Sequence, residues 1–291
     1  MGHLHLWVAE DGGIFEKDGL NVQDTLVSSS NATMAALLSG QIDIAQSGGS
    51  DAVSASANGA DVVVLAVEIP VYSYLLEVPA SIKTLAGLKG GKIGIDSYGS
   101  SPDIAVRIAL KKGGLDPDKD VSIIPVGNMP TRVAALMQGA IQGTVLNPPA
   151  SLQVEDKGYH PLINLAQLKL PAVSQSTIAQ RSWVAAHRDA AQKYIDTLLL
   201  ADQRIRQDKP FTIQVMKKYL KSDDDRGMNN AYDFYVGQVY QPAPFPKPEM
   251  FQDSIAELSK TVPALKNYDV TKILDPSFVQ NAVDRGLAKS S

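Results

Sequence analysis

The sequence predicts an α/β protein built from two similar lobes, and two observations carry this prediction. Strand-like and helix-like segments alternate along the chain, a pattern typical of sheets with mainly parallel strands. In addition, Ala35–Ile42 is echoed by Ala134–Ile141 at an offset of 99 residues. Each copy predicts an amphipathic helix that ends at a glycine and leads at once into a short apolar strand, Ile42–Ala45 or Thr144–Leu146.

The sequence upstream of these copies repeats as well. Val22–Val27 and Val121–Val126 lie at the same offset, and both are predicted as strands. In the second unit the strand Lys92–Asp96 precedes a helix that begins near Pro102, and the matching strand of the first unit would fall before Met1. The repeat therefore predicts that lobe one lacks its opening strand. Two such lobes facing each other would enclose a cleft beyond the carboxyl ends of their strands.

The segment after the second unit predicts one strand and one long helix. Leu170–Ala179 is expected to be extended, and Ser182 is expected to cap a helix that runs from Trp183 through Asp208. Further helices follow to the end of the chain.

The composition excludes several classes of function. The chain has 291 residues with 27 Lys+Arg and 31 Asp+Glu, a net charge of −4 with both signs interspersed, so we expect no nucleic-acid partner. It contains no Cys, which excludes disulfides, Cys-ligated zinc, iron–sulfur clusters and thiolate nucleophiles. The longest apolar stretch, Val62–Ile69, is far short of the roughly 20 residues of a membrane helix, so we expect no membrane insertion.

Polar clusters follow three of the predicted strands, where an open α/β sheet binds its ligands. They are Ser47–Asp51, Ser97–Ser101 and Asn147–Pro149. In the first two, glycines let the backbone approach a ligand, and the start of the next helix offers free N–H donors. The alternative is that Ser50 and Ser101 only cap their helices.

Catalytic and metal-binding patterns are weak. No Gly-x-Ser-x-Gly elbow or Walker A motif occurs, and Gly90–Gly94 precedes its strand rather than following it. Arg107 and Arg132, near helix starts, are candidates either for pairing a ligand anion or for ordinary salt bridges. We therefore predict no catalytic residues, no cofactor and no metal. Of the four histidines, only His3 and His5 lie at a spacing that metal ligands could have; His160 and His187 lie far from them in the sequence.

Four segments in this order resemble one family of proteins: Leu6–Val22, Gly40–Ala45, Leu88–Gly94 and Gly114–Val121. Together they resemble the substrate-binding proteins of ABC importers, in the nitrate, taurine and alkanesulfonate branch that is also called NMT1/THI5-like. The similarity covers nearly the whole chain.

The resemblance implies a type II periplasmic-binding fold, in which two Rossmann-like lobes are joined by two crossover strands, here near Pro70–Val78 and Pro171–Ala179. Residues 1–72 would form the first part of lobe one, residues 73–172 lobe two, and residues 173–291 the return to lobe one with the C-terminal helices. By position, the resemblance implies that the ligand contacts His3, His5, Gly48, Gly49, Ser50, Asp51, Tyr98, Ser100, Ser101, Asn147 and Ser174.

The resemblance also implies a function. The chain would be the extracytoplasmic solute-binding component of an ABC import system, a monomer that binds a small sulfonate- or carboxylate-like anion and delivers it to permease subunits. The N-terminus shows no export signal, so either the protein is cytoplasmic or the signal lies outside the given sequence. The resemblance implies the second, a periplasmic or extracytoplasmic protein whose signal is truncated or removed. An enzyme of the thiamine-pyrimidine-synthase type is the alternative, which the absence of Cys disfavours. No helix-turn-helix precedes the fold, as a LysR-type regulator would require.

Overall fold

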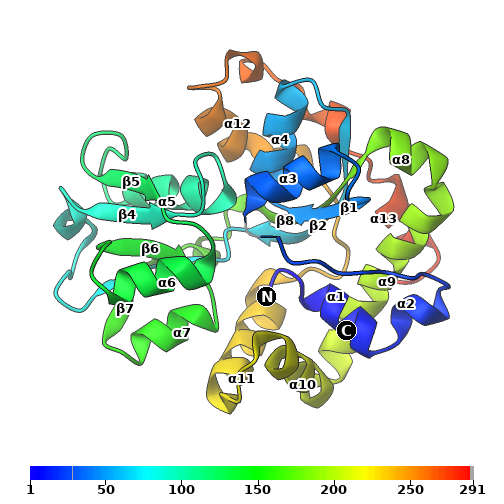
Figure 1. Ribbon diagram of the computed structural model, residues 1–291, viewed down its shortest axis with the longest axis horizontal. Helices are drawn as coiled ribbons and strands as arrows, with labels where there is room; N and C mark the ends of the chain where they lie inside the picture. The colour runs from blue at the N-terminus through cyan, green and yellow to red at the C-terminus, as the bar shows by residue number, and fades with distance from the viewer. Residues whose placement is uncertain (28, 289–291) are drawn as a thin grey trace.

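Two β-sheets of different size organise the chain, which this computed structural model describes over residues 1–27 and 29–288 (Figure 1). Within those residues the smaller sheet has the strand order β1-β8-β2, and the larger has the order β5-β4-β6-β3-β7. β8 is antiparallel to both of its neighbours, whereas β4 is parallel to β5 and β6. The strands are β1 (Ile44–Ser47), β2 (Val62–Val71), β3 (Leu75–Pro79), β4 (Lys92–Ile95), β5 (Ser122–Pro125), β6 (Gly143–Leu146), β7 (Tyr159–Asn164) and β8 (Pro171–Gln180).

Two stretches of chain connect the sheets. β2, at one edge of the smaller sheet, leads through residues 72–74 into β3 of the larger sheet, and the chain returns from β7 through residues 165–170 into β8. Every residue of β2 is buried, including Glu68, whose carboxylate accepts a hydrogen bond from the Thr177 hydroxyl of β8. The predicted α/β architecture of two lobes with two crossovers is confirmed. We call the part built on the smaller sheet lobe one and the part built on the larger sheet lobe two.

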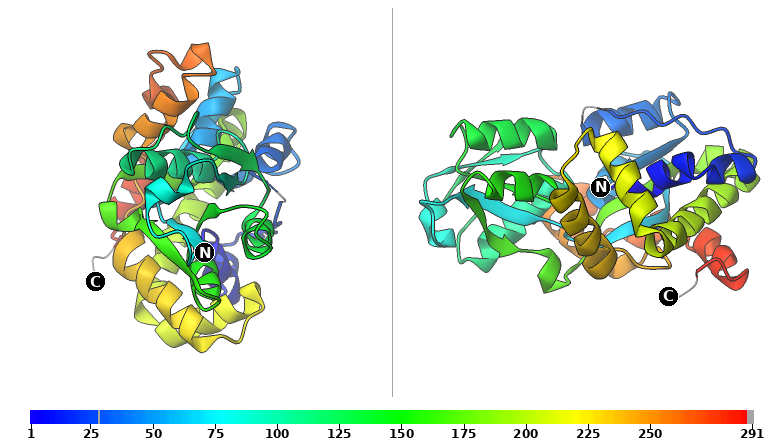
Figure 2. Two further views of the ribbon diagram at one scale, coloured as in Figure 1. Left: turned by 90° about the vertical axis from the view of Figure 1, so that its left-hand side faces the viewer. Right: turned by 90° about the horizontal axis from the view of Figure 1, so that it is seen from below.

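Helices cover both sheets. In lobe two, α5 and α6 pack on β4 and β6, and α7 packs on β3 and β7; in lobe one, α4 packs on β2 and β8. A further group of helices, α1, α9, α10 and α11, gathers beside lobe one (Figures 1 and 2). The helices are α1 (Leu4–Asp11), α2 (Ile14–Lys17), α3 (Ser30–Leu38), α4 (Gly49–Ala57), α5 (Ser101–Lys112), α6 (Met129–Met137), α7 (Ala150–Glu155), α8 (Arg181–Ala186), α9 (Arg188–Gln207), α10 (Lys209–Leu220), α11 (Asp225–Phe234), α12 (Gln252–Leu258) and α13 (Ser277–Asp284).

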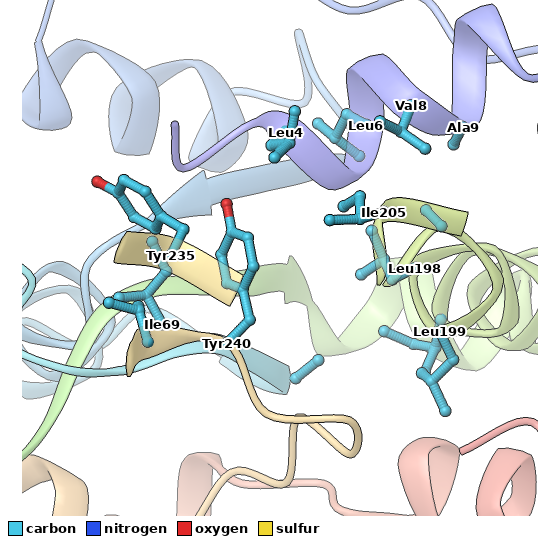
Figure 3. Close-up of a cluster of buried hydrophobic side chains, with 14 of the residues drawn as sticks. Leu4, Leu6, Val8, Ala9, Ile69, Leu198, Leu199, Ile205, Tyr235 and Tyr240 are labelled. Atoms are coloured by element: carbon cyan, nitrogen blue, oxygen red, sulfur yellow. The ribbon is translucent and has the colours of Figure 1, made fainter. Parts of the chain in front are cut away.

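The N-terminal helix α1 is held by apolar packing rather than by its caps. It has no side-chain N-cap, and five of its eight residues are buried: Leu4, His5, Leu6, Val8 and Ala9. In Figure 3, Leu6 lies over Ile205 and Leu198 of α9, and Leu4 lies on the side of Tyr240; all five belong to one buried cluster. Since burying a leucine side chain stabilises a fold by about 1.5–3 kcal/mol, this face is enough to fix α1 against α9.

The strands predicted from the repeat form with one exception. β4, β5, β6 and β1 lie within two residues of the predicted positions, but residues 22–27 are not a strand. In lobe two the corresponding strand β5 pairs only with β4. The structure of lobe one contains no described counterpart of β4, as the repeat predicted, so residues 22–27 have no neighbouring strand to pair with. The prediction of a strand at 22–27 was wrong because a strand needs a partner for its backbone.

The long helix predicted after β8 is interrupted. Ser182 lies inside α8 rather than at its cap. The helix is interrupted at His187, which separates α8 from α9. The φ and ψ angles of His187 are −128° and 38°, and its ring stacks on Trp183 at 5.1 Å between centroids. His187 ends the first helix and precedes the second, so the chain changes direction there.

Candidate functional site

The start of α4 is organised by one buried carboxylate. Asp51 accepts hydrogen bonds from the Ser47 hydroxyl at 2.5 Å and from the Gly48 backbone N–H at 3.0 Å. Burial raises the pKa of Asp51 to about 6, and the hydrogen bonds from Ser47 and Gly48 oppose this shift. Ser50 is 1% exposed, and its hydroxyl has no hydrogen-bond partner in the described structure. The first turn of α4 therefore presents a buried hydroxyl that no protein group satisfies.

A glycine is required where α4 meets lobe one's sheet. A Cβ added at Gly49 would lie 2.5 Å from the Cβ of Val173 in β8 and 2.9 Å from the ring of Phe251. Any larger residue would push the helix away from the sheet. Gly49 thus fixes the distance of the α4 N-terminus from β8.

The start of α5 repeats this design in lobe two. The Ser100 hydroxyl donates to the Ser97 carbonyl at 2.7 Å, and the Gly99 N–H donates to the Asp103 carboxylate at 2.8 Å. Gly99 adopts a φ of 79°, the left-handed region that glycine tolerates best. Ser101 is 7% exposed, and within the described chain its hydroxyl also lacks a partner. The first residue of α5 therefore carries a second buried hydroxyl without a hydrogen-bond partner in the described structure.

The two helix N-termini lie against each other across the lobes. A Cβ added at Gly48 would lie 3.2 Å from the Cβ of Ser101. The turn before α4 and the first residue of α5 are therefore in direct contact. Four residues predicted from separate motifs, Gly48, Ser50, Asp51 and Ser101, thus gather at one place between the sheets.

Three further residues lie around this place: Tyr74 and Tyr235, which the sequence did not single out, and Arg132, which it left open between ligand pairing and a salt bridge. Tyr74 follows β2; burial raises its pKa, while the nearby Ser101 hydroxyl and Arg132 charge oppose the shift. Arg132 is 2% exposed and donates to the Val145 carbonyl at 2.8 Å, but its Nε has no partner among the described residues. Tyr235, after α11, is buried near Ser73 and Tyr74 with an unpartnered hydroxyl. The Tyr-Ser-Tyr sequence at 72–74, between two apolar strands, was a usable signal for Tyr74; nothing local marked Tyr235.

The remaining predicted residues lie in several environments. Ser174, next to Val173 of β8, donates to the Val71 carbonyl at 2.8 Å, and the Asn147 carbonyl accepts from the Ser151 N–H in the turn after β6. Tyr98 is 59% exposed, and its hydroxyl donates to the Ile123 carbonyl of lobe two.

The two N-terminal histidines belong to the α1 region of lobe one. His5 lies 3.4 Å from Asp202 of α9 and packs edge-on against Tyr240. His3 lines a separate cavity inside lobe one. The structure therefore does not bring His3 or His5 into the group formed by Gly48, Ser50 and Ser101.

Neither of the two arginines weighed from the sequence is a free surface cation. Arg107 is paired with Asp103 at 2.8 Å and with Asp118 at 2.6 Å, which fits the salt-bridge alternative. Arg132 instead lies buried beside Tyr74 and Asp96. Among the described residues no group of three or more His, Asp or Glu is arranged to hold a metal ion. No helix in that part of the chain combines the length and apolar character needed to cross a membrane.

Comparison with known proteins places the chain in one family. The sequence pattern of the NMT1-like family matches residues 1–220. A relative from Bacillus subtilis (strain 168), named "Putative binding protein YtlA", is 24% identical over 271 residues, which cover 89% of this chain and 81% of YtlA.

Solved structures share the fold. The alkanesulfonate-binding protein SsuA from Xanthomonas axonopodis pv. citri, bound to MOPS, has a TM-score of 0.76 at 20% identity, over 96% of this chain and 93% of SsuA. The periplasmic nitrate-binding protein NrtA from Synechocystis PCC 6803 has a TM-score of 0.77 at 18% identity, over 100% of this chain and 89% of NrtA. The desulfurization enzyme DSZB is also similar, with a TM-score of 0.72 at 14% identity, over 97% of this chain and 96% of DSZB. The family match spans most of the chain, and the chain therefore belongs to the NMT1-like family.

Proposed function

We propose that this chain is the extracytoplasmic solute-binding component of an ABC import system and that it holds a small organic anion between its lobes. The observation that carries the proposal is the pair of buried, unpartnered hydroxyls of Ser50 and Ser101, which lie at the first turns of α4 and α5. A buried hydroxyl without a partner costs free energy, and a ligand oxygen between the two would satisfy both. Gly48, which touches Ser101, lets the two helix starts approach.

The electrostatics of this place favour an anion. Each helix N-terminus carries a partial positive charge that stabilises a nearby anion by roughly 0.3–1 kcal/mol. Arg132 adds a buried cation with an unpartnered Nε. The Asp51 carboxyl works in the opposite direction when it is ionised, and its pKa of about 6 means that it loses its charge in mildly acidic solution. A sulfonate or carboxylate with a small organic body fits this combination.

The proposed assembly follows from the same family membership. The chain acts as a monomer outside the cytoplasm and delivers its ligand to permease subunits of an importer. Residues 1–72 and 173–291 contribute to lobe one and residues 73–172 form lobe two, so that the ligand bridges both. Support comes from the name of the Bacillus relative and from the fold shared with SsuA and NrtA.

The second candidate is an enzyme on the same fold, because DSZB shares it. An enzyme of the thiamine-pyrimidine-synthase type is disfavoured because the chain contains no Cys. We therefore propose binding without turnover. Incubation of the protein with its bound anion, followed by mass spectrometry of the small molecule, tests this: recovery of the unchanged anion is expected, and a steady accumulation of product would instead favour the enzyme.

The binding experiment uses calorimetry with taurine, methanesulfonate, acetate and nitrate as separate probes. At least one sulfonate or carboxylate is expected to bind the wild-type protein with a 1:1 stoichiometry. Ser50→Ala and Ser101→Ala should each weaken that binding about 5- to 10-fold, since each removes a hydrogen bond of about 1–1.5 kcal/mol. Ser81→Ala, at an exposed position, is the matched control.

Two results would refute the proposed site. The first is unchanged affinity in both serine variants with unchanged circular dichroism spectra. The second is binding of none of the anions by protein from which native mass spectrometry shows that no ligand was carried through purification.

A further inference from the structure

Lobe one contains a groove that the proposed anion site does not use. Its volume is about 580 Å³. One wall is the extended segment of residues 20–27, and the other is residues 41–46, which include most of β1. His3, Trp183 and Tyr194 also line it. Figure 1 shows the dark blue trace between α2 and α3 that forms the first wall.

Both walls present backbone groups without strand partners. β1 pairs through one edge with β8 and forms the outer strand of its sheet, so its other edge faces the groove. Within the described chain, no backbone hydrogen bond joins residues 21–27 to another residue. Unpaired edges of this kind are templates for pairing with an added strand.

Lobe two shows how a strand can lie between two walls of this kind. There, β4 lies between β5 and β6 and is parallel to both, with Ile93 opposite Ile123 and Gly94 opposite Thr144. In the internal repeat, residues 22–27 occupy the position of β5, and β1 occupies the position of β6. The groove therefore lies at the position in lobe one that β4 fills in lobe two.

We propose that this groove binds an extended apolar peptide segment of about four residues, which enters as a strand parallel to β1 and pairs with β1 on one side and residues 22–27 on the other. Apolar side chains are required at alternate positions because Leu6, Ile44 and Ala45 line the groove. β4 itself, with the sequence Lys-Ile-Gly-Ile, has three buried residues in the equivalent place. The segment orders residues 22–27 into a strand when it binds.

The experiment uses a peptide taken from the chain itself. The probe is an acetylated and amidated peptide with the sequence of residues 91–97, Gly-Lys-Ile-Gly-Ile-Asp-Ser, added to the full chain. Hydrogen exchange followed by mass spectrometry should show at least 10-fold slower exchange over residues 22–27 and 42–47, and the melting temperature should rise with peptide concentration. The control peptide carries Ile93→Pro and Ile95→Pro, which removes two strand N–H groups, and should produce neither effect.

A protein variant distinguishes backbone pairing with the peptide from nonspecific apolar binding of the peptide. Thr25→Pro removes one N–H donor from the first wall, where the described structure gives it no backbone partner. This variant should keep the melting temperature of the free protein but lose most of the protection that the peptide produces. Three results would overturn the proposal: no protection at saturating peptide, equal protection from the proline peptide, or protection of the same residues by concentration-dependent dimerisation without peptide. The last would assign the groove to a second copy. None of these results depends on the anion site, because the groove and the anion site share no lining residue.

Discussion

Ser50 and Ser101 show how the site depends on single residues of small size. Each follows a strand-end turn that contains glycine, and each keeps its hydroxyl buried without a partner. The serine and glycine pattern was visible in the sequence, and so was the expectation that both turns lie at the carboxyl ends of strands. Their direct contact was not, because it depends on how the two lobes are oriented.

Arg132 illustrates a residue whose role the sequence left open. A cation near a helix start is usually solvated or paired, and Arg107 is indeed paired with two aspartates. Arg132 differs because its side chain turns toward the sheet: it is 2% exposed, and its guanidinium donates to the Val145 carbonyl of β6. No local pattern distinguishes the two arginines, since burial is decided by tertiary packing.

Glu77 carries a prediction at this scale. It lies in β3, fully buried, and neither carboxyl oxygen has a hydrogen-bond partner in the described structure. Burial and the neighbouring Glu155 carboxyl raise the pKa of Glu77 from 4.5 to about 8. The folded state therefore prefers the protonated form, and the stability that this provides is complete below pH 4.5 and is lost as the pH rises through 8.

We expect Glu77→Gln to remove this dependence. The free energy of unfolding of the wild-type protein should fall relative to the variant by about 4 kcal/mol between pH 4.5 and pH 9, since each pKa unit corresponds to about 1.4 kcal/mol. Urea denaturation at several pH values measures it. Glu16→Gln, at an exposed position of α2, is the control and should follow the wild-type profile. Parallel profiles for wild type and Glu77→Gln would contradict the assignment.

The elements that the repeat predicted are those whose partners are present. β4, β5 and β6 pair as a parallel group, and their short apolar sequences suffice to locate them. Residues 22–27 are apolar enough for a strand yet remain irregular, because pattern alone does not supply backbone hydrogen bonds. The break at His187 was equally hidden, since Ala-Ala-His-Arg is compatible with an unbroken helix.

Helix α4 offers a prediction at the scale of elements. Gly49→Ala should lower the free energy of unfolding by about 1–3 kcal/mol, because the added methyl group would lie 2.5 Å from Val173 and must displace α4 from β8. Anion binding should weaken in parallel, since the α4 N-terminus moves with its helix. Gly237→Ala is the matched control because a Cβ there meets nothing within 4 Å. Equal stability of the two variants in urea denaturation would show that α4 is not fixed by this contact.

At the scale of the whole molecule, charged pairs join the lobes beside the site. Glu257 of α12, which packs on α4, is paired with Lys111 of α5 at 2.5 Å and lies 3.6 Å from Arg107. Lys111 and Lys260 lower the pKa of Glu257 despite the opposing effect of burial. These pairs hold α5 of lobe two against lobe one in the arrangement described here.

We expect Glu257→Gln to favour a more open arrangement. Small-angle scattering of the ligand-free variant should give a larger radius of gyration than the wild type, and a bound anion that contacts both lobes should reverse the difference. Asp189→Asn is the control, since it removes an exposed pair with Lys193 within a single helix. An unchanged radius of gyration in Glu257→Gln would mean that apolar packing alone sets the angle between the lobes.

The position of β8 in the middle of lobe one's sheet governs the order in which the protein can be built. Ser47 of β1 meets Ser176 of β8 across a separation of 129 residues, and β2 likewise pairs with β8. During synthesis on a ribosome, β1 and β2 therefore emerge long before the strand that joins them, whereas all five strands of lobe two emerge between them and β8. Lobe two can therefore fold before the sheet of lobe one is complete. Until residue 180 has been made, β1 and β2 lack their partner strand and must stay free of aggregation.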